Sequence, residues 1–475
     1  MNKDIRNCIQ CFIILVLLGS ILIGCEQEYK EVVNKEPIIN LKETEIRQED
    51  MLRHIEELIS EKYKGRMVGT EGNRLAEDYI VENFQKLGLK GPSGIKGYKQ
   101  TYKQDVILLE EKPLLQTIDK SGNVSTDFDY VDDFIIRRLS SETTSVNITS
   151  PLIMLESADM LFNKNVDFEG KILLIPAKLS WLVGKPDYPA DLAIKYNASA
   201  VICEFDLSDN VQGLKYLRVT PLQESWQQSD YKPFIFVESK TFDMLTEAEK
   251  TGKKVRFQSS ATPLKFVDAA NVIGIIPGTD PEFEYSYIII GAHFDHVGDN
   301  LDGTYNAGAL DNASGPAAML EIARIIKENK IAPKRPIAFI GFNGESSGFK
   351  GSRHFVSNPL FSLGKAVMIN LDMVGASADE KLLLAKAPNT SSAMSVPRNA
   401  LAKYAEELGI DYITDFSGGS DHVSFAEIDV PSVMIIHPDF KNGYHSPHDT
   451  IEDISGDKLE EVVRLVLYYI QENAY

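Results

Sequence analysis

The sequence has 475 residues, of which 43% are hydrophobic and 25% are charged, and its formal net charge at pH 7 is −20. This length is ample for a large core and suggests two or three domains. The negative charge argues against nucleic-acid binding, because a polyanion requires a basic surface, and it fits a soluble exported protein.

The N-terminal segment resembles a bacterial lipoprotein signal. Two basic residues precede the apolar run CIQCFIILVLLGSILIG, which is short for a helix that spans a membrane. The run ends at Leu22-Ile23-Gly24-Cys25, and such signals are cleaved before a cysteine that then carries lipid. We predict a signal peptide over residues 1–24, membrane attachment through lipidated Cys25, a tether over 25–46, and a body held at the cell envelope outside the cytoplasm. An uncleaved N-terminal anchor helix is the alternative.

The first half of the body separates into two styles of sequence. Residues 49–63 and 75–89 have the apolar spacing of amphipathic helices, and the loop KGRMVGTEGN lies between them. From about residue 141 the chain changes to short β-like runs, such as KILLIPA and SAVICEF, without a cluster of His, Asp and Glu. We predict an inserted β-rich domain over 141–261, within a catalytic domain formed by 47–140 and 262–475. The run DFEGKILLIPA followed by AIKYNASAVIC resembles the protease-associated domain that is inserted in several exported peptidases.

After Asn271 apolar strand-like runs alternate with amphipathic helices. The expected strands are NVIGIIPG, YSYIII, PIAFIGFN, KAVMINLDMVG and VPSVMIIH, and the expected helices cover 314–328, 399–410 and 457–471. Such alternation predicts an α/β fold whose mainly parallel or mixed sheet is covered by helices on both faces. Ligands of such sheets bind beyond the carboxyl ends of the strands.

Several polar residues fall at those strand ends. His293 and Asp295 follow the strand YSYIII, and residues two apart in an extended chain point to the same side. The other candidates are Asp311 before the helix 314–328, Glu345 and Asp372 after two further strands, and His445 in the loop GYHSPHDT. Each has an ordinary structural alternative, since an Asp before a helix is often only an N-cap. Together they suit a divalent cation such as zinc.

The motifs that carry these residues resemble metallopeptidase family twenty-eight, the co-catalytic zinc aminopeptidases and related exopeptidases. The matching motifs are AHFDHVG, GALDNASG, the GES loop with its GxxGS ending, NLDMVG, GSDHVSFAEIDVPSV and YHSPHDT. The resemblance runs from about residue 271 to 470 and includes KGRMVGTEGN with the helix that follows it. It implies the zinc exopeptidase fold.

The resemblance also implies a role for each candidate residue. His293 and Asp372 would hold one zinc, and Asp311 would bridge to a second zinc that His445 also binds. Asp295 would orient the ligand His293. Glu345 would act as the general base, and Tyr444 would stabilise the oxyanion.

One position departs from the family pattern. The family has Glu-Glu-x-Gly at the base, whereas this chain has Glu345-Ser346-Ser347-Gly348, so Ser346 stands where a ligand of the second zinc belongs. A neutral hydroxyl is a poor substitute for a carboxylate. We expect one complete zinc site and a second that is weak or empty, with His448 as a candidate replacement ligand.

The expected function is a zinc-dependent exopeptidase that removes N-terminal residues from exported peptides, through a metal-activated water with Glu345 as the base. The alternative is a weakened or inactive homologue that acts as a lipoprotein binding peptides or partners, because Ser346 replaces a ligand. A third reading keeps the fold but changes the reaction, to carboxypeptidase or aminoacyl-cyclisation chemistry.

Overall fold

The computed structural model describes residues 40–138, 145–182, 193, 195–206, 232–388, 395–414, 418–440 and 443–475. The predicted signal peptide 1–24, Cys25 and most of the predicted tether lie outside these residues. Residues 40–475 group into one compact unit by their contacts. Within the described part of the chain, none of the helices combines the length and the apolar character that crossing a bilayer requires.

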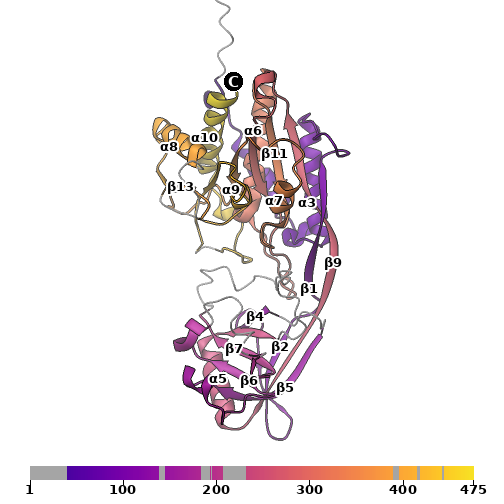
Figure 1. Ribbon diagram of the computed structural model, residues 1–475, viewed down its shortest axis with the longest axis vertical. Coiled ribbons are helices and arrows are strands. Elements are labelled where there is room, and N and C mark those ends of the chain that lie inside the picture. The colour runs from indigo at the N-terminus through magenta and orange to yellow at the C-terminus, as the bar shows by residue number, and fades with distance from the viewer. Residues whose placement is uncertain are drawn as a thin grey trace, which may run out of the picture. The chain divides into compact units, whose positions relative to one another are not determined.

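Strands on either side of the long strand β9 share one hydrogen-bonded network (Figure 1). From β9 (Lys254–Ile276) the order in one direction is β11 (Ile337–Phe342), β10 (Ile288–His293), β12 (Val367–Leu371), β15 (Ser432–Ile436), β13 (Leu382–Ala385) and β14 (Tyr412–Ile413). In the other direction the order is β5 (Ser145–Met154), β6 (Ile172–Ile175), β7 (Ala200–Glu204), β8 (Phe234–Val237) and β4 (Phe134–Arg138). β1 (Lys99–Leu109), β2 (Leu114–Ile118) and β3 (Val124–Phe128) lie off this path.

The centre of the first arm is parallel. β10 pairs in parallel with β11 and β12, and β12 pairs in parallel with β15. Every residue of these four strands is buried, which explains why their sequences are continuous apolar runs rather than alternating ones. β9 and β13 join this core in antiparallel orientation. The prediction of a mixed α/β sheet with helices is confirmed.

Helices pack on both faces of this sheet, and one further helix packs on β5 and β7 of the other arm. Their bounds are α2 (Gln48–Leu58), α3 (Glu71–Lys86), α5 (Ser239–Lys250), α6 (Ser314–Glu328), α7 (Lys350–Ser357), α8 (Val396–Leu408), α9 (His422–Ala426) and α10 (Gly456–Ala474). Ile289 of β10 packs with Phe355 of α7 and Phe425 of α9. The neighbouring residues of β10 point to the opposite face, where α6 contacts the strand and carries α2 and α10.

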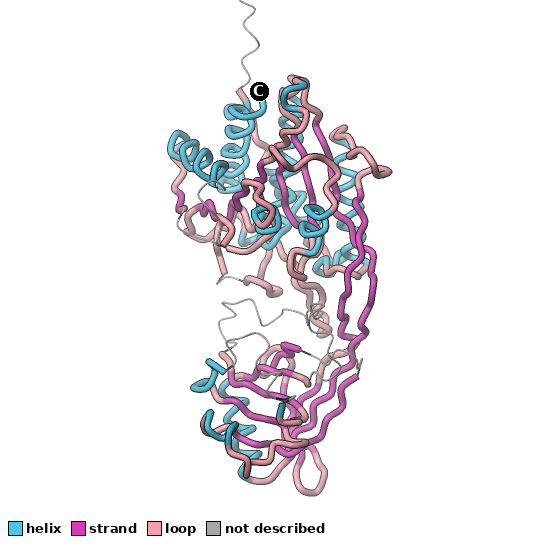
Figure 2. Tube along the Cα trace, in the orientation of Figure 1, coloured by secondary structure: helices cyan, strands magenta, loops and turns pink. Residues whose placement is uncertain are grey.

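β9 is shared by both arms of the network. Its first half pairs with β2 and β5, and its last residues pair with β11. β1 runs antiparallel beside it from Lys99↔Val272 to Leu109↔Ala261 (Figure 2). β9 therefore passes through the predicted domain boundary at 261 without interruption. The assignment of 141–261 as a protease-associated domain stays a prediction.

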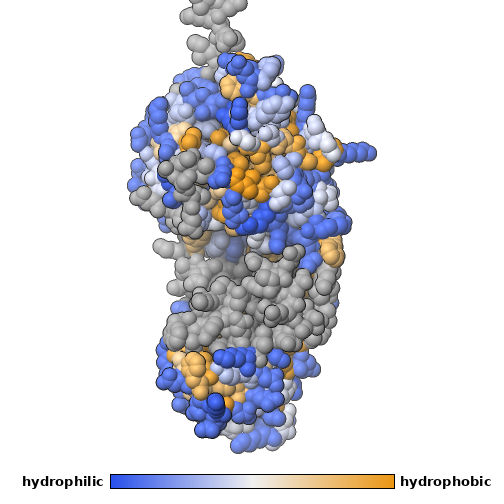
Figure 3. Space-filling model, viewed as in Figure 1, coloured by the Kyte–Doolittle hydropathy of each residue, from blue (hydrophilic) through white to orange (hydrophobic). Residues whose placement is uncertain are grey.

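The surface agrees with the acidic composition. The face drawn in Figure 3 is mostly hydrophilic where side chains are described, with smaller apolar areas between the charged ones. The apolar residues instead fill the interior, in the sheet core and in two clusters around β5 to β8.

Candidate active site

Three parallel strands deliver polar side chains to one edge of the sheet. β10 ends at His293, Asp372 directly follows β12, and Glu345 lies three residues after β11. Because His293 is in register with Phe342, the last residue of β11, these ends meet at the same level. Residues far apart in the sequence thus converge because the strands are parallel and adjacent.

The first cluster consists of His293, Asp311 and Asp372, all buried. Nε2 of His293 lies 3.3 Å from Oδ1 of Asp372 and 3.4 Å from Oδ1 of Asp311. A carboxylate oxygen of Glu345 is 4.0 Å from the same nitrogen. The side chains that the sequence assigned to the first zinc therefore surround one point.

Asp311 also belongs to a second cluster. Its Oδ2 lies 2.9 Å from Nε2 of His445 and 3.6 Å from Nδ1 of His296. The two oxygens of one carboxylate therefore face two different groups of donors, as a bridging ligand does. Within the described residues, these two clusters are the groups of at least three side chains with metal-ligand spacing.

Asp295 lies behind the first cluster. Its carboxylate accepts hydrogen bonds from the backbone N–H groups of Glu345 (3.0 Å) and Ser346 (3.2 Å). Its backbone oxygen lies 3.2 Å from Nδ1 of His293, whereas its Oδ1 is 3.7 Å away. The carboxylate thus fixes the loop that carries Glu345, and both the carboxylate and the backbone oxygen of Asp295 lie beside Nδ1 of His293.

Sequence reasoning missed two residues that position Asp311. Asp449 accepts hydrogen bonds from the N–H groups of Leu310 (2.7 Å) and Asp311 (2.9 Å). Asn312 donates to the carbonyls of His293 and Leu371 and accepts from the N–H of Met373. The side chains of Asp449 and Asn312 thus connect, by hydrogen bonds, separate segments that carry residues of the two clusters. The only sequence signal for them was their place inside the matched motifs.

Arg66 was also missed, because the sequence analysis described KGRMVGTEGN only as a loop between two helices and as part of the resemblance. Its guanidinium is fully buried and donates to four backbone carbonyls, those of Leu58, Phe294, Ala307 and Gly308, at 2.7–2.9 Å. It therefore clamps the end of α2 to the segments on both sides of the two clusters.

Ser346, which stands where the family pattern has a glutamate, is also unusual in the structure. The hydroxyl of Ser346 is buried and has no hydrogen-bond partner among the described residues. His448, the replacement suggested by sequence, is exposed and belongs to neither cluster. Besides His445, the second cluster contains His296, which the sequence analysis did not select.

Burial sets the protonation of the groups around the clusters. It raises the pKa of the Glu345 carboxyl well above its usual value, and the nearby carboxylate of Asp372 reinforces the rise. Burial likewise raises the pKa of Tyr444, so its hydroxyl keeps its proton at neutral pH. Burial lowers the pKa of His296 well below its usual value, which leaves the imidazole neutral, the form that binds metals.

The donor set fits divalent zinc. Tetrahedral zinc with bonds of about 2.0–2.1 Å needs ligand atoms about 3.4 Å apart. The separations measured around Asp311 run from 2.9 to 3.6 Å. Imidazole nitrogens and carboxylate oxygens are the donors found in catalytic zinc sites.

The clusters open into a cleft of about 400 Å³. Its polar lining residues include Asp311, Glu345, Asp372, Tyr444 and His445, and its apolar lining residues include Phe349, Met373, Met434, Ile436 and Phe440. The Tyr444 ring stacks on His445 with 3.9 Å between centroids. A cleft with a few convergent polar groups and an apolar wall is the usual form of a binding site.

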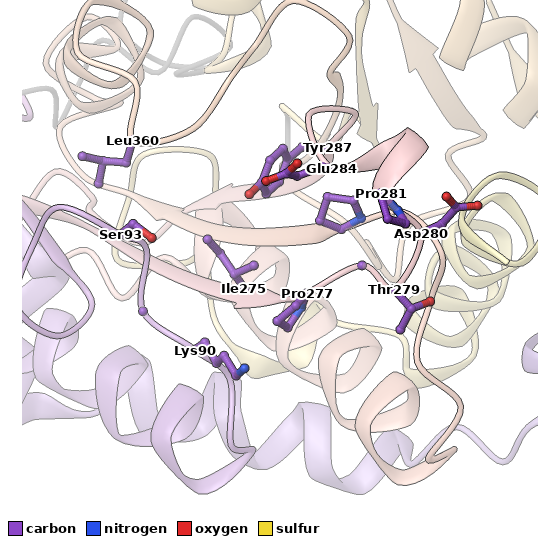
Figure 4. Close-up of a pocket in the computed structure, with 13 residues that line it drawn as sticks. Lys90, Ser93, Ile275, Pro277, Thr279, Asp280, Pro281, Glu284, Tyr287 and Leu360 are labelled. Atoms are coloured by element: carbon purple, nitrogen blue, oxygen red, sulfur yellow. The ribbon is translucent and has the colours of Figure 1, made fainter.

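A second cavity of about 450 Å³ lies elsewhere in the fold (Figure 4). Lys90, Ile275, Pro277, Asp280 and Glu284 are among the residues that line it. None of its lining residues belongs to either cluster, so the chemistry is assigned to the cleft at Asp311.

Comparison of the sequence with known proteins agrees with this geometry. Residues 271–470 match the family described as Peptidase family M28. Aminopeptidase YwaD of Bacillus subtilis is 30% identical over 254 residues, which are 50% of this chain and 51% of that protein. A probable zinc metalloprotease of Pyrenophora tritici-repentis is 27% identical over 234 residues, covering 42% and 52%. The chain thus spans about half the length of the curated relatives it matches.

Solved structures share the fold. An aminopeptidase from Aneurinibacillus sp. strain AM-1 has a TM-score of 0.65 at 21% identity, covering 90% of this chain and 94% of that one. The zinc aminopeptidase BSAP from Bacillus subtilis also has a TM-score of 0.65, at 23% identity, covering 90% and 96%. Residues 271–470, which contain every residue of both clusters, therefore match Peptidase family M28, and the chain has a fold that solved aminopeptidases share.

Proposed function

We propose that this protein is a zinc-dependent aminopeptidase that hydrolyses the first peptide bond of peptides outside the cytoplasm. The observation that carries the proposal is the carboxylate of Asp311, whose oxygens face His293 at 3.4 Å and His445 at 2.9 Å. One carboxylate shared by two donor clusters is the arrangement that a pair of cations requires. The match to Peptidase family M28 and the similarity to aminopeptidases support the same reaction class.

In this mechanism His293, Asp372 and Asp311 would hold the first cation, and Asp311 and His445 would belong to the second site. Bound zinc supplies Lewis-acid chemistry, polarising the scissile carbonyl and lowering the pKa of water. Glu345 removes the proton from the attacking water and returns it to the leaving amine. Tyr444 keeps its proton and lines the cleft, so it donates to the carbonyl oxygen as that oxygen becomes negative.

The cleft suggests which N-terminal residues are accepted. The wall formed by Met373, Met434, Ile436 and Phe440 offers apolar surface next to the polar side of the cleft. Burying a large aliphatic or aromatic side chain there gains about 1.5–3 kcal/mol. We therefore expect leucyl and phenylalanyl substrates to be preferred over glycyl ones.

The proposed place of action is the cell envelope. It follows from the lipoprotein-like segment that ends at Cys25 and from the net charge of −20. Globomycin-sensitive processing in a bacterial host and labelling with a fatty-acid analogue test it, with Cys25→Ala as the variant that should lose the label. Unchanged labelling of that variant would exclude this attachment.

Turnover of leucyl-p-nitroanilide by the zinc-loaded protein tests the activity. Glu345→Gln should lower kcat on the order of 100- to 10,000-fold while metal content stays unchanged, because only the proton transfer is lost. Glu427→Gln, an exposed carboxylate paired with Arg353, is the matched control and should leave kcat unchanged. An N-acetylated leucyl substrate should not be hydrolysed.

Two outcomes would contradict the proposal. A metal-loaded protein without turnover on a panel of unblocked peptides would favour the weakened, peptide-binding homologue that Ser346 suggests. Cleavage of N-blocked peptides from their carboxyl end, or cyclised products, would keep the fold but change the reaction.

A further inference from the structure

We propose that His296 is a ligand of the second cation and takes the place of the carboxylate that Ser346 lacks. The inference builds on the proposed function by defining its second metal site as His296, Asp311 and His445. Its test counts metal ions rather than turnover, so it can fail while the peptidase activity stands.

The position of His296 results from the end of β10. The strand stops at His293, and the residues that follow it are not part of a strand. The alternation of side chains therefore does not continue to His296, whose ring lies at Asp311 and edge-on to His445, with 5.6 Å between the two ring centroids. The ring is 99% buried, with only 1% of the residue exposed.

Gly308 makes room for this ring. A Cβ atom built on Gly308 would lie 2.6 Å from Cδ2 and 2.8 Å from Cγ of His296. Gly308 also has a φ of 65°, which side chains rarely adopt. The imidazole is thus seated directly on the backbone that leads to Asp311, and a side chain at position 308 would displace it.

The described residues do not account for the burial of the two ring nitrogens of His296. Neither Nδ1 nor Nε2 has a hydrogen-bond partner among the described residues, and the 3.6 Å to Asp311 is too long for a hydrogen bond. A buried polar group left without a partner costs about 1–3 kcal/mol. A cation between Nδ1 and Oδ2 of Asp311 removes that cost, because 3.6 Å is close to the ligand spacing of tetrahedral zinc.

The exchange changes the character of the site. With a second carboxylate the site would carry two negative charges, whereas His296 and His445 leave Asp311 as its only charged donor. Nitrogen donors favour zinc, cobalt and nickel over magnesium and calcium. The second site should therefore discriminate strongly against the hard cations.

Metal counting tests the assignment. Wild-type protein and His296→Ala are loaded with Zn²⁺, dialysed against a weak chelator and measured by inductively coupled plasma mass spectrometry. We expect two equivalents in the wild type and one in the variant, with the affinity of the second site at least about 100-fold weaker. His437→Gln replaces another buried histidine outside both clusters and should retain two equivalents.

Cobalt spectra and a rescue variant separate a ligand from a supporting residue. The visible absorption of the Co²⁺ protein should lose intensity at the second equivalent in His296→Ala. Adding Ser346→Glu to that variant restores a carboxylate on the same cleft and should return the second equivalent. His296→Asn keeps a polar side chain at this position. The circular dichroism spectra of both His296 variants check that any loss of metal does not result from misfolding.

Two results would overturn the proposal. One is a His296→Ala protein that binds two equivalents with unchanged affinity and spectrum. The other is a folded wild-type protein that binds a single equivalent even in excess Zn²⁺.

Discussion

At the scale of single residues, His437 shows how a buried imidazole contributes to the acid sensitivity of the fold. Its Nδ1 accepts a hydrogen bond from the N–H of Gly375 at 3.0 Å, which requires the neutral ring. Burial lowers its pKa to about 3, and Lys458 adds to the effect. The folded state therefore disfavours protonation. The stability from this residue is complete above about pH 6.5 and declines as the pH falls toward 3.

We expect His437→Gln to flatten that decline, because the glutamine carbonyl can accept the same hydrogen bond and does not titrate. The urea midpoint of the variant should fall less between pH 7 and pH 5 than that of the wild type. Parallel loss of stability in both proteins would show that His437 is not the group responsible.

The candidate ligands could be found from the sequence one residue at a time only where strand geometry applies. His293, Asp311 and Asp372 were recognisable because they border strands and a helix. His296 was not, because alternation assigns it to the opposite side from His293, and alternation ends with β10 at His293. Asp449 and Arg66 act through backbone groups distant in sequence, and no local pattern reports such contacts.

At the scale of elements, the η2 segment (Glu61–Arg66) connects α2 to the loops of the site through the hydrogen bonds of Arg66. Lys64, Gly65 and Arg66 all have positive φ, and Arg66 donates to four carbonyls from three segments. Burial lowers the pKa of Arg66 to about 10, so it remains charged at neutral pH near Asp449 and Asp311.

Arg66→Lys should lower the free energy of unfolding by about 3–5 kcal/mol, because an ammonium cannot make the same fork of contacts and leaves buried carbonyls unpaired. Urea denaturation measures the loss. Arg74→Lys, an exposed arginine paired with Glu71, is the control and should change stability by less than about 1 kcal/mol. Equal effects of the two substitutions would contradict the role of Arg66.

The elements themselves were the most predictable level. Periodicity alone located the helices that became α2, α3, α6, α8 and α10, because each carries apolar residues at helical spacing. The extent of β9 was not predictable, since a 23-residue strand exceeds the usual length and depends on pairing partners from two parts of the chain.

At the scale of the whole molecule, stability should depend on cations. Asp295, Asp311, Asp372, Asp421 and Asp449 are all at most 6% exposed, and most of them surround the two clusters. The chain also carries a net charge of −20, and Arg66 is a buried cation near three of these carboxylates, Asp295, Asp311 and Asp449. Ions that bind only the folded state stabilise it by mass action.

Removal of metal with EDTA should therefore lower the melting temperature by several degrees, and added Zn²⁺ should restore it. Differential scanning calorimetry measures both steps, and added Mg²⁺ serves as the comparison because it is a poor match for imidazole donors. A melting temperature unaffected by EDTA and by Zn²⁺ would show that the clusters hold no ion that matters for folding.

The position of the Asp311 carboxylate between the two clusters has a consequence for cation binding to them. The two oxygens of Asp311 face different clusters. A cation bound at one oxygen would therefore change the electron density and the orientation of the other oxygen. If both clusters bind a cation, the two binding steps influence each other through this carboxylate, and thermodynamics makes that influence equal in both directions. A titration curve for cation uptake should consequently deviate from that of two separate sites, and its shape would report the strength of this communication.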